Sequence, residues 1–251
     1  MSERFYSATP ITAERVTLDG PEAHHLLHVM RAKVGEQVTL FDGSSDEFTA
    51  EVVKLSRATA ELQILERRIL DRELPFELIV AVALPKGDRQ KWLVEKLTEL
   101  GVTTLVPIET ARGVAQPTAG TLDRLRRSVI EAAKQCGRNR LMQIAEPKSW
   151  SNLIASDPRS PEPSPQRRPH RRLVAHPGGK PLTQFNLATP TATQLAICPE
   201  GGLTDEEINA ALAAGWQTVD LGPRILRVET AAVALAAAIS LSAGRNRNRA
   251  T

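Results

Sequence analysis

A stretch near the carboxyl end of the chain contains the side chains best suited to chemistry. Glu200 lies in the turn Pro-Glu-Gly-Gly at 199–202, and Arg224, Arg227 and Glu229 follow farther along. A carboxylate can accept a proton, and a guanidinium can stabilise negative charge that develops during a reaction. The same residues would also fit a plain turn and a set of surface ion pairs, with Glu229 as the partner of a helix dipole. The residues alone leave both interpretations open.

Two strand-to-loop transitions are expected to position these side chains. The apolar run 195–198 predicts a buried strand, and Thr204 with Glu207 forms a capping box that opens a helix after the turn. A second strand, 218–221, ends at Gly222-Pro223 and leads into an alanine-rich helix near Glu229. Both loops follow the carboxyl end of a strand, which is where open α/β sheets bind ligands.

A third loop of the same kind follows the short strand 173–176, at Pro177-Gly178-Gly179. Neither GxGxxG nor GxxxxGK[ST] occurs in the chain, so an enzyme that binds nucleotide phosphates, such as a kinase or a dehydrogenase, is disfavoured. Three loops rich in glycine and proline and poor in charge suit an adenosine-like or other small ligand held by backbone groups.

Composition bounds the class of protein. With 251 residues and 41% hydrophobic content, the chain can bury a sizeable core, and we favour two domains. Its two cysteines are too few for a disulfide framework, its beginning has no apolar signal region, and no run suits a membrane span. We therefore expect a soluble, cytoplasmic protein. His24 and His28 share a helix face, but no third ligand supports them, so we expect no metal site.

The domain boundary is expected near residue 72. Residues 1–72 contain short β segments at 36–42, 48–55 and 59–65, with one helix beginning at Pro21. From residue 73 to 251, strands and helices alternate: strand 77–84, helix 88–100, strand 103–108, helix 121–136. Such alternation predicts an α/β domain with a parallel sheet and crossover helices. Within it, residues 157–172 combine prolines and arginines with few apolar residues and predict a flexible loop.

Positive charge gathers in the middle of the chain, where residues 73–172 contain 17 Lys and Arg against 11 Asp and Glu. On the first helix of the α/β domain, Trp92, Leu93 and Leu97 are expected to line the buried face. On the second, the apolar face leaves six basic side chains largely outside, namely Arg124, Arg126, Arg127, Lys134, Arg138 and Arg140. This basic face could contact a polyanion, although solvated helix surfaces often look the same.

The helix that starts near Glu229 is apolar on every side. Residues 231–239 are all Ala, Val, Leu or Ile, so no polar face is available for solvent. This pattern predicts a helix that is buried on all sides and that packs closely through small side chains.

The motifs together resemble the family of 16S ribosomal RNA uridine-N3 methyltransferases, which belongs to the SPOUT class. The matching segments run along nearly the whole chain: Arg4-Phe5, His25-Leu26, Val29 with Arg31, Gly35, 41–43, 84–88, 96–102, Pro107, 131–138, 199–202 and 221–231. The last two are the most specific. Two departures stand out, because Cys198 occupies a position where the family usually has glycine, and the stretch 157–172 looks longer than usual.

The resemblance implies a PUA-like β-barrel at 1–72 that grips RNA, followed by a SPOUT α/β domain with a C-terminal deep trefoil knot. It implies S-adenosyl-L-methionine as cofactor, 16S ribosomal RNA or the small ribosomal subunit as partner, and a homodimer. The implied catalytic residues are Arg227, which would stabilise charge on the uracil oxygens, and Glu200 or Glu229, which would accept the proton or orient that arginine.

Two further sets of residues follow from the resemblance. The implied cofactor-binding residues are His176, Pro177, Gly178, Ile197, Cys198, Glu200, Gly201, Gly202, Leu221, Gly222, Ile225 and Leu226. The implied RNA-binding residues are Arg4, Arg31, Lys86, Arg124, Arg127 and Arg138. The alternatives are a SPOUT methyltransferase for another RNA and an RNA-binding protein without catalysis; the cofactor loops argue against the second.

Overall fold

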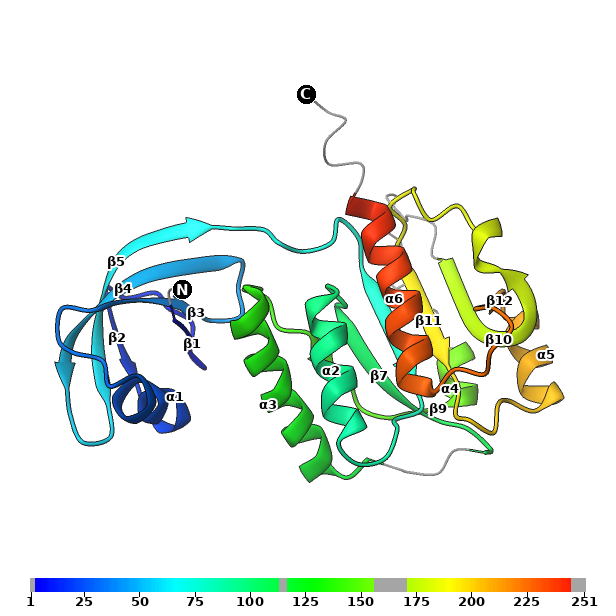
Figure 1. Cartoon of the computed structure of the whole chain (residues 1–251), viewed down its shortest axis with the longest axis horizontal. Helices are drawn as coiled ribbons and strands as arrows, with labels where there is room; N and C mark the ends of the chain where they lie inside the picture. Colours follow the sequence, from blue (N-terminus) through cyan, green and yellow to red (C-terminus); the bar gives the residue numbers. More distant parts are fainter. Residues whose placement is uncertain (1–2, 113–116, 156–170, 245–251) are drawn as a thin grey trace. The chain divides into compact units, whose positions relative to one another are not determined.

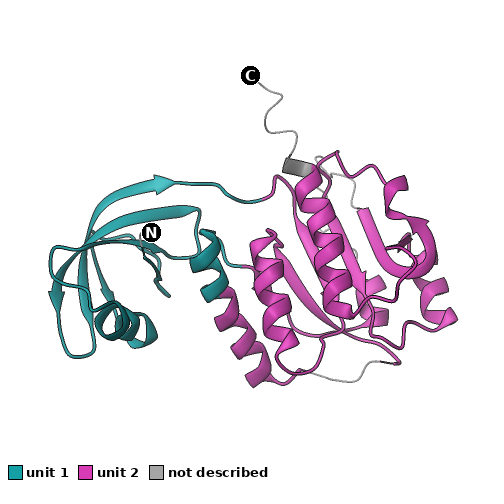
Figure 2. Ribbon diagram, in the orientation of Figure 1, with its two compact units in different colours: residues 1–73, 130–141 teal, residues 74–129, 142–251 magenta. Residues whose placement is uncertain are grey.

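The computed structural model describes residues 3–112, 117–155 and 171–244 (Figure 1). The chain forms two compact units (Figure 2). Unit 1 comprises Met1–Glu73 and Ile130–Leu141, and unit 2 comprises Leu74–Val129 and Met142–Thr251. Helix α3 (Ala119–Cys136) therefore contributes residues to both units. Most of the stretch 157–172 lies outside the described residues, but Arg171 and Arg172 already belong to a strand.

Unit 1 is built on a five-stranded sheet in the order β1-β3-β4-β5-β2. Its strands are β1 (Arg4–Tyr6), β2 (Arg15–Leu18), β3 (Gln37–Phe41), β4 (Asp46–Leu55) and β5 (Ala60–Ile69). The neighbours are antiparallel except for the parallel pair β1 and β3. Alternate side chains of β4 are buried, as expected for a strand with one face toward the core. The strands expected at 36–42, 48–55 and 59–65 are confirmed, whereas β1 and β2 were not expected.

The helix expected from Pro21 is divided. It begins as α1 (Gly20–His24) and continues as the π-helix η1 (His25–Met30). Arg31 ends it in the left-handed region with φ of 58°, which is uncommon for a residue other than glycine. The side chain of Arg31 is exposed at this turn.

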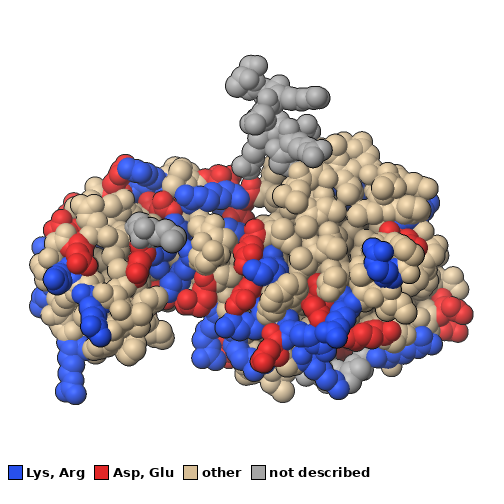
Figure 3. Space-filling model, in the orientation of Figure 1, with Lys and Arg blue, Asp and Glu red and all other residues tan. Residues whose placement is uncertain are grey.

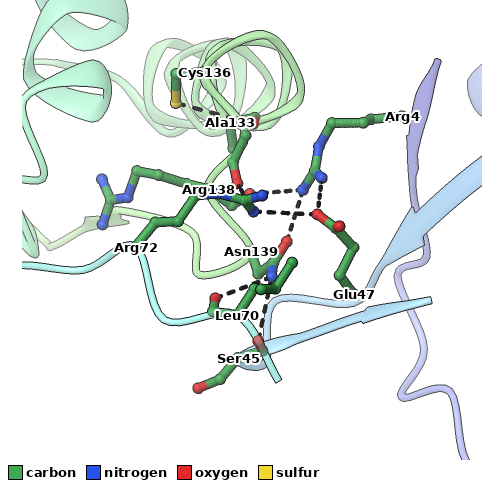
Figure 4. A network of polar contacts seen from close by, with 10 residues as sticks. Arg4, Ser45, Glu47, Leu70, Arg72, Ala133, Cys136, Arg138 and Asn139 are labelled. Atoms are coloured by element: carbon green, nitrogen blue, oxygen red, sulfur yellow. Dashed lines mark hydrogen bonds and ion pairs between the residues drawn. The ribbon is translucent and has the colours of Figure 1, made fainter. Parts of the chain in front are cut away.

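A polar network ties the end of α3 and the turn after it into unit 1 (Figure 4). The guanidinium of Arg4 donates to the side-chain oxygen of Asn139 at 2.7 Å and pairs with Glu47. Asn139 in turn donates to the backbone carbonyls of Ser45 and Leu70. These contacts satisfy groups that are largely removed from water, so they hold residues 137–140 against the sheet.

Two basic side chains, one near the end of α3 and one just after it, are largely removed from solvent, contrary to expectation. Arg138 is only 4% exposed, and its guanidinium contacts both carboxylate oxygens of Glu73, at 3.0 and 2.5 Å. Lys134 lies against the ring of Phe5 and donates to Glu22 at 3.1 Å. The expectation that both side chains point outward was wrong, because helical periodicity could not show that this end of α3 packs on the β-sheet.

Unit 2 contains a seven-stranded sheet in the order β12-β10-β11-β6-β7-β8, with β9 pairing β7. The strands are β6 (Leu78–Val82), β7 (Thr104–Glu109), β8 (Gln143–Ile144), β9 (Lys148–Ser149), β10 (Arg171–Pro181), β11 (Thr193–Ile197) and β12 (Gln217–Asp220). Every pair is parallel, which confirms the predicted parallel sheet. All five residues of β11 are buried, as expected for a central strand that is covered on both faces.

Helices cover this sheet. They are α2 (Arg89–Glu99), the beginning of α3, α4 (Trp150–Ala155), α5 (Asp205–Ala213), α6 (Val228–Gly244) and the short 3-10 helix η2 (Leu182–Gln184). The capping box of α5 is confirmed, because Thr204 accepts from the Glu207 backbone and Glu207 accepts in return. Trp92 is 43% exposed, so the expectation that it lines the buried face of α2 was wrong. No helix among the described residues is long and apolar enough to cross a membrane.

Helix α6 packs against α2 and against strands β6 and β11. One side of it is nevertheless open, since Ala234 is exposed and Leu241 is 70% exposed. The expectation of burial on every side is therefore wrong for the single chain. In Figure 3 the area where α6 lies is a broad surface without charged atoms.

Candidate functional site

Three loops of unit 2 enclose a pocket with a cavity volume of about 490 Å³. Two of them follow the carboxyl ends of β11 and β12, the third is an irregular stretch within β10, and the first turns of α6 also line the pocket. All of the expected cofactor-binding residues except Gly178 line it: His176, Pro177, Ile197, Cys198, Glu200, Gly201, Gly202, Leu221, Gly222, Ile225 and Leu226. Of these, the Ile225 side chain is 96% exposed and stands at the rim. The structure therefore brings three separate sequence segments together at one site.

The loop near His176 differs from the expected loop at a strand end. Strand β10 continues to Pro181, and its pairing with β12 shifts register between Ala175 and Lys180, so that both face Val219. The four residues between them form a bulge inside the strand. Gly179 is required there, because an added Cβ would lie 2.8 Å from the backbone of Thr218 and Val219. The bulge pushes His176 and Pro177 out of the strand and into the pocket wall.

Asp220 connects two of the pocket loops. Its carboxylate accepts a hydrogen bond from the backbone N–H of Gly178 at 3.1 Å and another from Gly222 at 2.7 Å. Both glycines have positive φ, 78° and 106°, a conformation that residues with side chains rarely adopt. Although Gly178 does not line the pocket, this bond fixes the bulge that does.

The Pro-Glu-Gly-Gly turn is held from the loop that follows β7. Arg112 donates to the carbonyl oxygen of Gly201 at 2.8 Å, and the backbone N–H of Ala111 donates to Glu207 at 3.0 Å. The turn itself is closed by a bond from Gly202 to the carbonyl of Pro199 at 2.8 Å. Arg112 also packs over Gly201, since a Cβ added there would lie 3.2 Å from that of Arg112.

Cys198 lines the pocket at the end of β11. Burial, with a smaller contribution from the negative charge of Glu207, raises the pKa of its thiol well above the usual range. Only a thiolate is a strong nucleophile, so this cysteine serves as a small apolar wall residue.

The three candidate catalytic residues stand in different environments. Arg227 is exposed, and its side chain forms no ion pair within the described part of the chain. Glu200 lines the pocket, whereas Glu229 lies beside it, in the first turn of α6, and is only 6% exposed. The guanidinium of Arg89 contacts both carboxylates, at 3.7 Å to Glu200 and 3.3 Å to Glu229. Glu229 therefore pairs with Arg89, and the surface cluster with Arg224 and Arg227 that the sequence allowed does not form.

The candidate RNA-binding residues divide into two groups. Arg31, Lys86, Arg124 and Arg127 are exposed, and in Figure 3 basic atoms gather over the part of unit 2 where α2 and the beginning of α3 lie. Arg4 and Arg138 instead belong to the network inside unit 1 (Figure 4). Their guanidinium groups bind Glu47, Asn139 and Glu73, so the expectation that Arg4 and Arg138 contact RNA phosphates does not fit the structure.

The rings of His24 and His28 lie 4.8 Å apart, as expected for neighbours on one helical face. Within the described ranges, no group of three or more His, Cys, Asp or Glu is arranged to hold a metal ion.

Three residues of the site were missed by sequence reasoning: Arg89, Arg112 and Asp220. Asp220 directly precedes Leu221-Gly222, and an Asp side chain often accepts a hydrogen bond from the backbone N–H two residues later. This pattern could have identified Asp220 from the sequence. Arg89 and Arg112 contact residues 140 and 89 positions away, respectively. No local pattern could have indicated those partners.

Comparison with known proteins agrees with this architecture. Residues 72–240 match the model of an RNA methyltransferase domain, and residues 18–65 match that of an RNA methyltransferase PUA domain. A protein of Synechocystis sp. named ribosomal RNA small subunit methyltransferase E is 38% identical over 222 residues, covering 88% of this chain and 71% of that protein. A protein of the same name from Bacillus subtilis is 29% identical, covering 91% of this chain and 90% of its own.

A solved structure is similar as well. The crystal structure of ribosomal RNA small subunit methyltransferase E from Neisseria gonorrhoeae bound to S-adenosyl methionine has a TM-score of 0.83 and 31% identity, and the match covers 96% of this chain and 98% of that one. The expected PUA-like N-terminal domain and SPOUT-like α/β domain are thereby confirmed. The chain belongs to the ribosomal RNA small subunit methyltransferase E family.

Proposed function

We propose that this protein transfers a methyl group from S-adenosyl-L-methionine to N3 of one uridine in 16S ribosomal RNA. The observation that carries the proposal is the pocket, which the bulge of β10 and the loops after β11 and β12 form in a chain of this family. The similar enzyme from Neisseria gonorrhoeae was crystallised with S-adenosyl methionine, and the curated relatives are named for small-subunit ribosomal RNA. The bacterial cytoplasm, where ribosomes are assembled, is the compartment that fits this substrate.

The residues present fit the cofactor. A volume of about 490 Å³ suits a ligand of nucleoside size, and the wall combines apolar side chains such as Leu203, Val219 and Leu226 with backbone groups of the glycine turns. We propose that the eleven lining residues named above hold it, with Gly178 acting through Asp220. When bound, S-adenosyl-L-methionine supplies an electrophilic methyl group on a positively charged sulfur.

The chain must then prepare the uracil. Nitrogen N3 carries a proton and is a poor nucleophile until that proton leaves, so a proton acceptor and a group that stabilises the uracil anion are needed. We propose Arg227 as the stabilising cation, because it is exposed, stands between the pocket-lining residues Leu226 and Val228, and has no ion-pair partner in the described residues. Glu200 and Glu229 supply the carboxylates, and Glu200 is the one that lines the pocket.

RNA is proposed to contact Arg31 in unit 1 and Lys86, Arg124 and Arg127 in unit 2, all of which are exposed. Such contacts release counterions, so affinity should fall steeply with salt, and each lost contact should lower the slope of log affinity against log salt by about one. If a variant without these four charges keeps the wild-type slope, the RNA surface lies elsewhere.

We also propose a homodimer formed through the open side of α6. This side presents Ala234 and Leu241 and no charged residue, and an apolar surface of this kind is stabilised by a second copy. Light scattering at micromolar concentration should give twice the mass of the chain. A fully active monomer would contradict the dimer.

The finer architecture is a proposal as well. We infer a PUA-like domain at 1–72 and a SPOUT domain at 73–251, whose C-terminal part is threaded as a deep trefoil knot. The family resemblance supports the knot, and so does the path of the chain, which passes β12 at the sheet edge before α6 returns to pack on β6 and β11. A crystal structure in which residues 171–244 do not pass through a loop formed by another part of the chain would contradict the knot.

The experiment that tests the function uses purified full-length protein with S-adenosyl-L-methionine labelled in its methyl group. The label should enter unmodified small-subunit ribosomal RNA or the small subunit, and should not enter large-subunit RNA. Binding of RNA without transfer of label would make the chain a non-catalytic RNA-binding protein, and transfer to another RNA alone would contradict the proposed substrate.

A further inference from the structure

Arg89 connects the rim of the pocket with a buried carboxylate. It is the first residue of α2, and its guanidinium nitrogen Nη1 lies 3.7 Å from Oε1 of Glu200 and 3.3 Å from Oε1 of Glu229. Glu200 lines the pocket and is accessible, whereas Glu229 is nearly buried at the start of α6. One cation thus stands between two carboxylates, of which one faces the ligand space.

The burial of Glu229 explains why Arg89 is held in place. A buried carboxylate is costly unless a cation or hydrogen-bond donors compensate it. Its second oxygen, Oε2, has no hydrogen-bond partner among the described residues, so Arg89 and the positive end of α6 carry that compensation. The strong attraction of Glu229 therefore anchors the guanidinium at a fixed position beside Glu200.

Arg224 and His176 line the same pocket as Glu200 but form no ion pair with it in the described structure, and the other charges near the two carboxylates are engaged. Of the elements that pack on α6, strands β6 and β11 have no ionisable side chain, and the remaining basic residues of α2 pair within that helix, Lys91 with Glu95 and Lys96 with Glu99. Around the Glu200 turn, Arg112 donates to the Gly201 carbonyl, and Glu207 accepts from two backbone groups. In the described structure, Arg89 is the cation that pairs with Glu200.

We propose that Arg89 is a positioning residue that Glu229 anchors and that holds Glu200 in place as proton acceptor. This inference rests on the proposed function. In the step concerned, the N–H bond at uracil N3 breaks, the proton moves to a Glu200 oxygen, and the electron pair stays on N3, where it forms the bond to the methyl carbon. The carbon–sulfur bond breaks with its pair going to sulfur, so charge and atoms balance.

Coulomb's law gives the two partners of Glu200 opposite effects. Arg89 favours the ionised form of Glu200, and Glu229 opposes it by weakening the field of that arginine. Replacing Arg89→Gln removes the cation that favours ionised Glu200, so the rising limb of the rate-against-pH profile should move to higher pH. In Glu229→Gln, Arg89 is left to pair with Glu200 alone, so the rising limb should move to lower pH.

The experiment measures methyl transfer to small-subunit ribosomal RNA by the full-length protein, at saturating S-adenosyl-L-methionine, between about pH 5.5 and 9. The variants are Arg89→Gln, Arg89→Lys, Glu229→Gln and Glu200→Gln, with Lys91→Gln as matched control, a charge change on the same helix within an exposed ion pair. We expect the rising limb of the pH profile to move in opposite directions in Arg89→Gln and Glu229→Gln. Arg89→Lys and Lys91→Gln should have profiles near that of the wild type, and Glu200→Gln should lose the rising limb.

Two results would overturn the inference: equal loss of rate at every pH in both Arg89→Gln and Glu229→Gln, or a rising limb that survives unchanged in Glu200→Gln. If Arg89→Gln fails to fold, the isosteric variant Glu229→Gln tests the inference. A rising limb at the wild-type pH in that variant would contradict the role of Glu229 as the anchor of Arg89. Wild-type protein that transfers no methyl group would refute the proposed function itself, and the two failures are therefore distinguishable.

Discussion

The carboxylate of Asp220 accepts a hydrogen bond from the backbone N–H of Gly178 at 3.1 Å, across 42 positions of sequence. The second carboxylate oxygen accepts from Gly222 at 2.7 Å, so a single side chain fixes the β10 bulge and the loop after β12. The shape of two pocket walls therefore depends on a residue whose own role is to orient backbone.

Replacing Asp220→Ala should weaken binding of S-adenosyl-L-methionine by about tenfold, since loss of one or two such hydrogen bonds costs on the order of 1–2 kcal/mol. Asp220→Asn keeps one carbonyl oxygen as acceptor, so its affinity for S-adenosyl-L-methionine should lie between those of the wild type and Asp220→Ala. Titration calorimetry measures the affinity, and Asp220→Ala with wild-type affinity and wild-type melting temperature would show that the loops hold without it.

Gly201 should tolerate no branched side chain. A Cβ there would stand 3.2 Å from the Arg112 Cβ, so a valine would displace Arg112 or the turn that lines the pocket. We expect Gly201→Val to raise the dissociation constant for S-adenosyl-L-methionine by at least about tenfold, equivalent to roughly 1.4 kcal/mol. Gly120→Ala is the control, because nothing lies within 4 Å of an added Cβ at that position. Equal affinities in both variants would contradict the packing of Arg112 over this turn.

Arg227→Ala should lower turnover by roughly two to three orders of magnitude, as does the loss of one preorganised charge-stabilising donor. Cofactor affinity should barely change, because Arg227 does not line the pocket. Rapid-quench kinetics at saturating cofactor separates the two effects. Weakened cofactor binding with near-normal turnover would make Arg227 a support for the loop instead of a group that stabilises the uracil anion.

Glu47 should link the stability of unit 1 to pH. Burial raises its pKa, but hydrogen bonds from Arg4 and Arg72 outweigh that effect and lower it overall from 4.5. A carboxyl whose folded-state pKa is depressed contributes stability above its unfolded pKa and loses it as pH falls through the folded value. Glu47→Gln should therefore reduce the free energy of unfolding at pH 7, and the difference from wild type should shrink below about pH 4.5.

Denaturant unfolding at several pH values tests this linkage, with Glu36→Gln as control, an exposed glutamate of the same unit. A difference between wild type and Glu47→Gln that stays constant down to pH values well below 4.5 would contradict it.

Features that depend on residues close together in the sequence could be predicted. The Thr204–Glu207 capping box, the parallel strands and the pocket loops after β11 and β12 follow from periodicity and from turn residues within about ten positions, whereas the expected loop at 177–179 is a bulge within β10. The contact of Arg89 with Glu229 and the bond from Arg4 to Asn139 span 140 and 135 positions and depend on the path of the whole chain. For the same reason, helical periodicity placed Arg138 on the surface, although the end of α3 and the turn after it belong to unit 1 and Arg138 is buried there.

The identity of the methylated nucleoside tests the central claim most directly. Small-subunit ribosomal RNA that lacks the modification is incubated with the protein and S-adenosyl-L-methionine, digested to nucleosides, and compared by chromatography and mass spectrometry with authentic methyluridines. The account predicts 3-methyluridine, at one methyl group per RNA molecule. A methyl group on the ribose or on carbon 5 of uracil, or no methylated nucleoside at all, would contradict it.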